Sequence, residues 1–519
     1  MSSGHSLSGD STRFVDWARA AAASISIPST DDEFDDLTAL DEFVGDARIV
    51  ALGESSHYIH EWNRFRCRLF KYLALHHGFT TFVLESALVE GRQVHDWVLG
   101  QDISWTTIVR DSITNAWGLW RELHELLHWM RAWNADPAKG RSLHFYGMDG
   151  TANWSHPHHA LQGVLVYLEE VDPRLAMEME QTVLPAAEMA TLESTDALAP
   201  DEWDRLLAGI AGLVSRLEQG RVEYARRSSP DAFDWALRCA EVARDIAAML
   251  RQLACQPEDG LLTFWNARDA AMADQLQWIL EREGPEARIL VGAHNAHLQH
   301  SPLFGAATSF SQYLCERIPR RTVRLIGAAN ARTIQPDGEP QAGSNQEAYA
   351  RVGSAPWFLD LHKAPRDGPV AAWLAHERPD RLNFQYQDLA PGRAWDAILY
   401  VDEVHLATLD LPPQLRRGGV SAPKDLARYS GEYQIQGFMG QQVCLTVELK
   451  GAALVADGRH DTSGELFPPA PRVLVPLSAT EFTWSDWPAV LSFVEAAGPT
   501  RVEIEMPGMG TFTGERSTS

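Results

Sequence analysis

Four apolar runs in the sequence each end on an acid or a histidine. The residues that end them are Glu54, Glu85, Asp149 and His294. Continuous apolar runs of this length are typical of strands buried on both faces, as in a parallel sheet. Because catalytic groups of open α/β sheets collect at the carboxyl ends of such strands, we expect these side chains along one rim. Three acids and a histidine there indicate acid/base chemistry or a metal site.

The first run leads into the sequence Gly-Glu-Ser-Ser-His at residues 53–57. Glu54 and His57 are three residues apart, so in a turn they can share one face. A carboxylate beside an imidazole fixes its tautomer and raises its basicity, which suits a general base that activates water. Gly53 permits a sharp turn where the strand ends. The alternative is a helix N-cap, in which one of the two serines caps and His57 is incidental.

Two further charged residues fit the same chemistry. Arg66 lies nine residues after His57, on the helix expected to follow, where it could orient a carboxylate or stabilise an oxyanion. The alternative for Arg66 is a surface salt bridge. Glu85 directly follows an apolar run, and an acid that ends a buried strand is costly unless it is paired or functional. The alternative for Glu85 is to cap the next helix.

A pair of histidines, His294 and His297, follows the fourth run in the sequence His-Asn-Ala-His. Two histidines at this spacing can converge on one substrate atom or one metal, and one can also support the other. Arg268 and Asp269 open the helix expected before this strand, where helix-end electrostatics also explain them. We give Asp149, Arg268 and Asp269 a supporting role.

Alternating strands and helices are needed to position these residues. The stretch from residue 26 to 149 shows this alternation, typical of βαβ units. Between residues 158 and 256 strand signals vanish, which predicts a helical insertion that forms a lid over the site or simply packs against the core. Apolar periodicity predicts the main helices at residues 61–77, 90–99, 117–134 and 265–279, and further strands at residues 323–326, 357–361 and 397–401.

The composition changes after residue 411. Residues 412–426 are rich in proline and glycine and predict a linker. Short β-like segments separated by turns predict an antiparallel β domain over residues 427–519. Residues 1–12 are rich in serine and glycine and predict a disordered tail. The predicted fold class is therefore α/β, with a mostly parallel sheet, flanking helices and a helical insertion over residues 13–411, plus the C-terminal β domain.

Charge and cysteine content exclude several classes of protein. The 519 residues carry 45 Lys plus Arg against 70 Asp plus Glu, a net charge of -25, which argues against a nucleic-acid or anionic-membrane partner. Five widely spaced cysteines, without a CxxC pattern, indicate reduced thiols. No secretory signal or run of transmembrane length is present. We expect a cytoplasmic protein that acts on a small molecule, with its oligomeric state open.

The motifs together resemble the erythromycin esterase family over about residues 40–410. The resemblance is carried by residues 53–57, Arg66, Gly78-Phe79 leading to Glu85, Gly147-Met148-Asp149, residues 268–273 and residues 293–297. It implies hydrolysis of a lactone or ester, such as a macrolide ring, by water and without a metal or other cofactor. It implies His57 as the general base, with Glu54, Arg66, Glu85, His294 and His297 lining the site.

Two positions depart from the family pattern. Tyr58 stands where the family commonly has glycine, and residues 301–305 replace the usual Met-Gly turn. Residues 427–519 resemble the lipocalin-like β domain that is appended to some relatives of serine β-lactamases. No GxSxG elbow, P-loop or GxGxxG fingerprint is present, which disfavours common serine hydrolases and nucleotide enzymes.

The leading hypothesis is a hydrolase that opens a lactone or ester. His57, oriented by Glu54, takes a proton from water, and Arg66 or one of His294 and His297 stabilises the oxyanion. Glu85 orders the water or Arg66. Two alternatives stay open. The same groups could catalyse a cyclisation, elimination or acyl transfer in natural-product biosynthesis, or the rim could bind a metal or haem in a protein that is not an enzyme.

Overall fold

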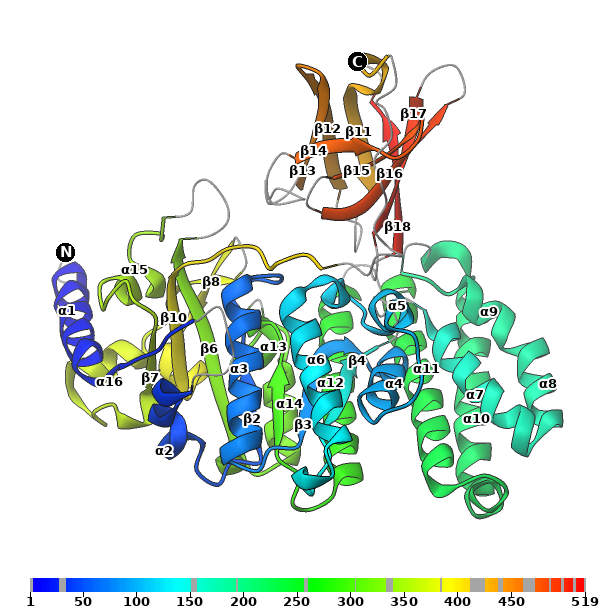
Figure 1. Cartoon of the computed structure of the whole chain (residues 1–519), viewed down its shortest axis with the longest axis horizontal. Helices are drawn as coiled ribbons and strands as arrows, with labels where there is room; N and C mark the ends of the chain where they lie inside the picture. The colour runs from blue at the N-terminus through cyan, green and yellow to red at the C-terminus, as the bar shows by residue number, and fades with distance from the viewer. Residues whose placement is uncertain are drawn as a thin grey trace.

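The computed structural model describes most of the chain. The described residues are 3–27, 34–150, 156–192, 195–255, 260–303, 305–332, 339–382, 385–410, 425–436, 442–460, 472–484, 487–495, 499–506 and 510–517. Within them an α/β core carries a separate β-barrel at its C-terminal end (Figure 1). The predicted fold class is confirmed.

The core is built on an eight-stranded sheet, counted over the described residues, in the order β1-β7-β10-β6-β2-β5-β3-β4. The strands are β1 (Ala23–Ser24), β2 (Ile49–Leu52), β3 (Thr81–Ala87), β4 (His144–Asp149), β5 (Ile289–Gly292), β6 (Val323–Arg332), β7 (Trp357–Asp360) and β10 (Ala397–Glu403). Every pair from β10 to β4 is parallel, whereas β7 runs antiparallel to both of its neighbours. The sheet is therefore mostly parallel, as predicted.

Both faces of the sheet are buried, which explains the unbroken apolar runs. In β2, Ile49 and Ala51 join the apolar cluster on one face, and Val50 and Leu52 join the cluster on the other. Helices α3 (His60–His76) and α6 (Arg121–Ala135) cover the second face, and α12 (Gly260–Glu283) and α14 (Phe310–Arg317) cover the first.

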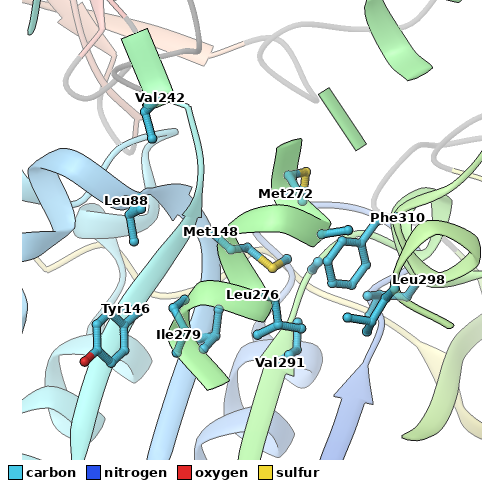
Figure 2. Packing of buried hydrophobic residues seen from close by; sticks show 14 of the residues in the cluster. Leu88, Tyr146, Met148, Val242, Met272, Leu276, Ile279, Val291, Leu298 and Phe310 are labelled. Atoms are coloured by element: carbon cyan, nitrogen blue, oxygen red, sulfur yellow. The ribbon is translucent and has the colours of Figure 1, made fainter. Parts of the chain in front are cut away.

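Helix α12 lies directly over the strands that carry the predicted site (Figure 2). Its residues Met272, Leu276 and Ile279 are fully buried and pack with Met148 of β4 and Val291 of β5. Their spacing of three and four residues keeps one face of the helix on the sheet. Residues 268 and 269 lie one turn earlier on that face, which places them over the carboxyl ends of the strands.

A group of helices extends the core beyond the edge strand β4 (Figure 1). They are α4 (Leu88–Val98), α7 (Pro157–Val171), α8 (Pro173–Thr182), α9 (Leu184–Met189), α10 (Pro200–Arg227) and α11 (Pro230–Cys255). Helices α7 to α11 occupy the stretch that was expected to be a helical insertion.

The N-terminal segment differs from its prediction as a disordered tail over residues 1–12. Helix α1 spans Ser3–Ala21, so the prediction is wrong from residue 3 onwards. The ring of Phe14 stacks on Trp373 with centroids 3.6 Å apart, and the Trp373 indole donates to the Ser11 hydroxyl at 3.1 Å. The partner helix α16 (Gly368–Ala375) is more than three hundred residues away in sequence, so local composition could not reveal this docking.

The predicted helix over residues 117–134 is broken near its start. A short 3-10 turn, Trp117–Leu119, is followed by α6 from Arg121. Residues 405–410 cross this break after β10: Leu409 forms a bridge with Trp120, and Leu406 forms another with Ile59. The break leaves Trp117 outside the helix and beside the rim of the sheet.

The C-terminal strands form a closed antiparallel barrel, counted as eight strands over the described residues. They are β11 (Gly431–Gln436), β12 (Gln442–Lys450), β13 (Ala453–His460), β14 (Arg472–Pro476), β15 (Glu481–Trp484), β16 (Trp487–Glu495), β17 (Pro499–Met506) and β18 (Gly510–Arg516). Fully buried aromatic side chains such as Tyr433 and Phe482 belong to its interior. The predicted linker, residues 412–426, lies almost entirely outside the described residues.

Candidate active site

The four residues that end the apolar runs do lie along one rim. Glu54 follows β2, Glu85 lies near the end of β3, Asp149 ends β4 and His294 follows β5. These strands are neighbours and run parallel in the order β2-β5-β3-β4. All four side chains are buried. The rim is thus a buried polar site at the carboxyl end of the sheet.

A carboxylate, an imidazole and a guanidinium are joined in the first part of the site. One oxygen of Glu54 lies 2.5 Å from Nδ1 of His57, and its other oxygen accepts from Nη2 of Arg66 at 2.8 Å. The side chain of Glu54 is fully buried, whereas that of His57 keeps 34% of its surface exposed. Nδ1 of His57 is bonded to the carboxylate, so Nε2 remains available to accept a proton.

The surroundings of His57 favour its protonated form. Burial opposes the charged ring, but Glu54, with help from Glu85, raises the pKa of His57 above its usual value. The same contact acts in reverse on the acid: burial opposes the carboxylate, while Arg66 and His57 lower the pKa of Glu54. The pair is a base whose proton affinity is raised by a buried negative charge.

Arg66 lies behind Glu54 and is not a surface ion pair. Its side chain is buried, Nη1 donates to Oδ1 of Asn63 at 3.2 Å, and its guanidinium lies 5.1 Å from the ring centroid of Trp117. A Cβ at Gly292 would lie 2.5 Å from Nε of Arg66. The missing side chain of Gly292 therefore makes room for the arginine against β5.

Glu85 connects the other acids and bases. One of its oxygens accepts from Nη2 of Arg268 at 3.1 Å, and the other accepts from the backbone N–H of His294 at 2.7 Å. Arg268 also donates to both oxygens of Asp149, at 3.2 and 2.5 Å. Of the two roles expected for Glu85, ordering the water or Arg66, the second is replaced by the contact with Arg268, because α12 brings Arg268 to the end of β3.

The charged groups around His297 hold it in place. Its Nδ1 lies 2.7 Å from Oδ1 of Asp269, and its Nε2 lies 3.4 Å from Glu85. Burial opposes a charge on this ring, but Asp269 and Glu85 raise the pKa of His297 to about 10. The other oxygen of Asp269 accepts from the backbone N–H of Phe310 at 2.7 Å, which anchors α14 to the site. Helix-end electrostatics do not explain Arg268 and Asp269, which lie inside α12 and face the rim.

His294 differs from the other two histidines in its protonation. Its Nδ1 accepts from the backbone N–H of Ala296 at 3.2 Å, so the proton of the neutral ring sits on Nε2. Burial and the neighbouring His57 lower the pKa of His294 to about 3. The centroids of the His57 and His294 rings are 4.8 Å apart. A neutral hydrogen-bond donor thus lies beside the candidate base.

Backbone packing around the site explains residues that sequence reasoning missed. A Cβ at Gly53 would collide with the side chain of Asn295, so close approach, and not only a sharp turn, requires this glycine. The Asn295 amide donates to the carbonyl of Ala328 at 2.7 Å and accepts from its N–H at 3.2 Å. The side chain thereby joins the loop after β5 to β6.

The capping alternatives for these residues are not realised. Helix α3 begins at His60 with Ile59 as N-cap, and the Ser55 hydroxyl instead donates to Asn330 at 2.6 Å. Helix α4 begins after Ala87 without a side-chain cap, so Glu85 does not cap it. Trp117 was also missed: its indole donates to the carbonyl of Glu85 at 2.8 Å, which the break before α6 makes possible.

Neither a metal cluster nor a membrane span is found in the described part of the chain. No group of three or more His, Cys, Asp or Glu side chains there is arranged to hold a metal ion. No helix in the same residues is long and apolar enough to cross a membrane.

The fold and this rim identify the class of protein. A family model described as erythromycin esterase matches residues 75–404, more than half of the chain. The chain therefore belongs to the erythromycin esterase family, as the motifs predicted.

Curated relatives extend this result. The chain is 26% identical to erythromycin esterase type II of Escherichia coli over 427 residues, which cover 75% of this chain and 98% of the relative. It is 23% identical to erythromycin esterase type I of the same organism over 56% of this chain and 72% of that protein. It is 21% identical to the putative hydrolase YbfO of Bacillus subtilis over 71% of this chain and 86% of the relative.

Solved structures show the same fold. A Bacillus cereus protein superposes with a TM-score of 0.66 at 22% identity, covering 77% of this chain and 99% of that one. A succinoglycan biosynthesis protein gives 0.63 at 20% identity, with 76% and 97% covered. An erythromycin esterase mutant in its open conformation gives 0.58 at 18% identity, with 75% and 98% covered.

Proposed function

We propose that this protein is a hydrolase that opens a lactone or other ester, with a macrolide-like natural product as the substrate class. The observation that carries the proposal is the contact between Glu54 and the partly exposed His57 at 2.5 Å. Membership of the erythromycin esterase family supports the reaction class, and relatives named for erythromycin support the substrate class.

The mechanism uses His57 twice. Nε2 of His57 takes a proton from water as the water oxygen bonds to the carbonyl carbon, and Glu54 stabilises the imidazolium that forms. The tetrahedral intermediate collapses as the bond to the leaving alcohol breaks, and His57 returns the proton to that alcohol. The products are a carboxylic acid and an alcohol, so one water is added overall.

The oxyanion of the intermediate needs a donor close to the base. His294 fits this role because it is neutral, carries its proton on Nε2 and lies beside His57. Arg66 and His297 are the other candidates. Two nitrogens of Arg66 already bond Glu54 and Asn63 behind the base, and His297 is held between Asp269 and Glu85. Arg66 therefore supports Glu54, and Glu85 holds the backbone of His294 in place.

Mass spectrometry of reactions with macrolides and simpler lactones tests this proposal. We expect a product heavier by one water, and a loss of about 10²–10⁴-fold in rate for His57→Ala, the usual worth of a general base. His376→Ala, which removes an exposed histidine next to α16, is the matched control and should keep full activity. A product of unchanged mass would instead favour cyclisation or transfer, and wild-type rates for His57→Ala would rule out the assigned base.

A further inference from the structure

Backbone strain gathers beside the candidate base. Within the described residues, three residues other than glycine adopt a left-handed backbone: Tyr58 with φ 63°, Asn115 with φ 56° and Ala116 with φ 58°. This conformation costs free energy for any residue with a Cβ, and it persists only where the surrounding structure enforces it. All three lie at one junction, because the Tyr58 hydroxyl donates to the carbonyl oxygen of Asn115 at 3.0 Å.

The junction closes a ring of contacts around His57. The ring of Tyr58 lies 5.6 Å from the imidazole, between centroids. Beyond Asn115 and Ala116 the chain reaches Trp117, whose ring meets His57 edge-on at 5.8 Å and Tyr58 also at 5.8 Å. The Trp117 indole is tied in turn to the carbonyl of Glu85. His57 is therefore flanked by the rings of Tyr58 and Trp117. The Tyr58 hydroxyl bonds the carbonyl of Asn115, two residues before Trp117.

The segment at residues 405–410 prevents the loop from relaxing. The carbonyl of Tyr58 accepts from the N–H of Ala407 at 2.8 Å, and the N–H of His60 donates to the carbonyl of His405 at 2.8 Å. The other side of the junction is held in the same way, since the N–H of Asp410 donates to the carbonyl of Leu119 at 2.9 Å. Both strained segments are thus pinned to one strand-like stretch.

We propose that Tyr58 is a positioning residue for His57, in an inference that rests on the proposed function. A glycine at position 58 would adopt this left-handed backbone without strain. The contacts of the Tyr58 side chain must therefore offset the free energy that the strained backbone costs. Through the Asn115 carbonyl and the Trp117 ring this side chain keeps the imidazole turned with Nδ1 on Glu54 and Nε2 available for water.

Three variants separate this role from a merely structural one. Tyr58→Phe keeps the ring and removes the tie to Asn115; Tyr58→Gly removes the ring and the backbone strain; Tyr58→Ala removes the ring and keeps the strain. Tyr72→Phe is the matched control, because it removes a hydroxyl bonded to Asp41 at a distance from the site. Thermal melting should rank Tyr58→Gly as at least as stable as Tyr58→Ala, as the left-handed φ demands.

Two readouts are used. The first is the steady-state kinetics with an ester that the wild-type protein hydrolyses, and the second is an NMR titration of the His57 ring. We expect Tyr58→Gly and Tyr58→Phe to lower kcat, by about 10–100-fold for the glycine variant, with a smaller change in KM, since misplaced groups cost rate more than binding. We expect the pKa of His57 to fall toward its usual value as its contact with Glu54 loosens. Tyr72→Phe should change neither.

The two proposals fail in different ways. If Tyr58→Gly keeps wild-type kcat and an unchanged His57 titration, Tyr58 is not a positioning residue, whatever the substrate. If the wild-type protein hydrolyses no ester, the proposed function fails, and the NMR titration, which needs no substrate, still decides the role of Tyr58.

Discussion

Arg66 and Gly292 share one small volume: the guanidinium reaches Glu54 only because residue 292 has no side chain. The Nε and Cδ atoms of Arg66 would lie 2.5 and 2.6 Å from a Cβ at Gly292, closer than real Cβ contacts allow. Arg66 is pinned by Glu54 and Asn63, so it cannot move aside without losing those bonds. A glycine in β5 is therefore part of the support for the base.

Gly292→Ala should displace Arg66 and weaken the pair of Glu54 and His57. We expect kcat to fall by about tenfold or more, because small misplacements of catalytic groups are costly. Gly212→Ala is the control: a Cβ there meets no atom within 4 Å, and alanine in helix α10 should stabilise by about 1 kcal/mol. Equal activity of the two variants in the ester assay would contradict the shared-volume argument.

Glu54→Gln tests the electrostatic effect of Glu54 on the basicity of His57. The carboxylate raises the pKa of His57, and only the neutral imidazole accepts a proton, so activity should rise with pH through that pKa. Removing the negative charge should move this rise to lower pH. The amide would also donate to Nδ1 and favour the wrong tautomer, so we expect kcat to fall by about 10²–10⁴-fold. A pH–rate profile whose rise keeps its wild-type position would show that Glu54 does not set the pKa.

Asp269→Asn tests the stability that His297 supplies. The folded-state pKa of His297 is about 10, above the value of about 6.5 for an unfolded histidine. A group with a raised pKa stabilises fully below its unfolded pKa, and that contribution is lost as pH rises toward its folded pKa. The wild-type free energy of unfolding should therefore fall between about pH 6.5 and 10. Urea titrations across this range should show a shallower fall for the variant; parallel curves would contradict the pairing.

Arg268→Met should be severely destabilising. It would leave the buried Asp149 and Glu85 without the guanidinium that Arg268 supplies to both, and breaking a buried pair typically costs about 3–5 kcal/mol. Arg205→Met removes an arginine that is 70% exposed and paired with Asp201, so it should cost about 1 kcal/mol or less. Urea denaturation of both variants gives the comparison, and similar losses would mean that the buried network contributes little.

Much of the fold could be predicted because its signals are local. The apolar run that ends at Glu54 predicts a strand buried on both faces, and β2 sends Ile49 and Val50 to opposite clusters. Strand direction follows from the helices between the runs, so the shared rim of Glu54 and His294 could also be predicted. The change in composition after residue 411 likewise predicts the β domain from local sequence alone.

The rest depends on contacts between residues far apart in the chain. Whether Glu85 pairs with Arg66 or Arg268 was decided by how α12 lies over β3 and β5, not by any spacing in the sequence. The docking of α1 on Trp373 and the release of Trp117 from its expected helix have the same origin. The residue types that reach the rim follow from local sequence patterns, because strand and helix periods are short-range. Which acid meets which base depends instead on how distant segments pack, because buried charges pair with whichever partner the packing brings within reach.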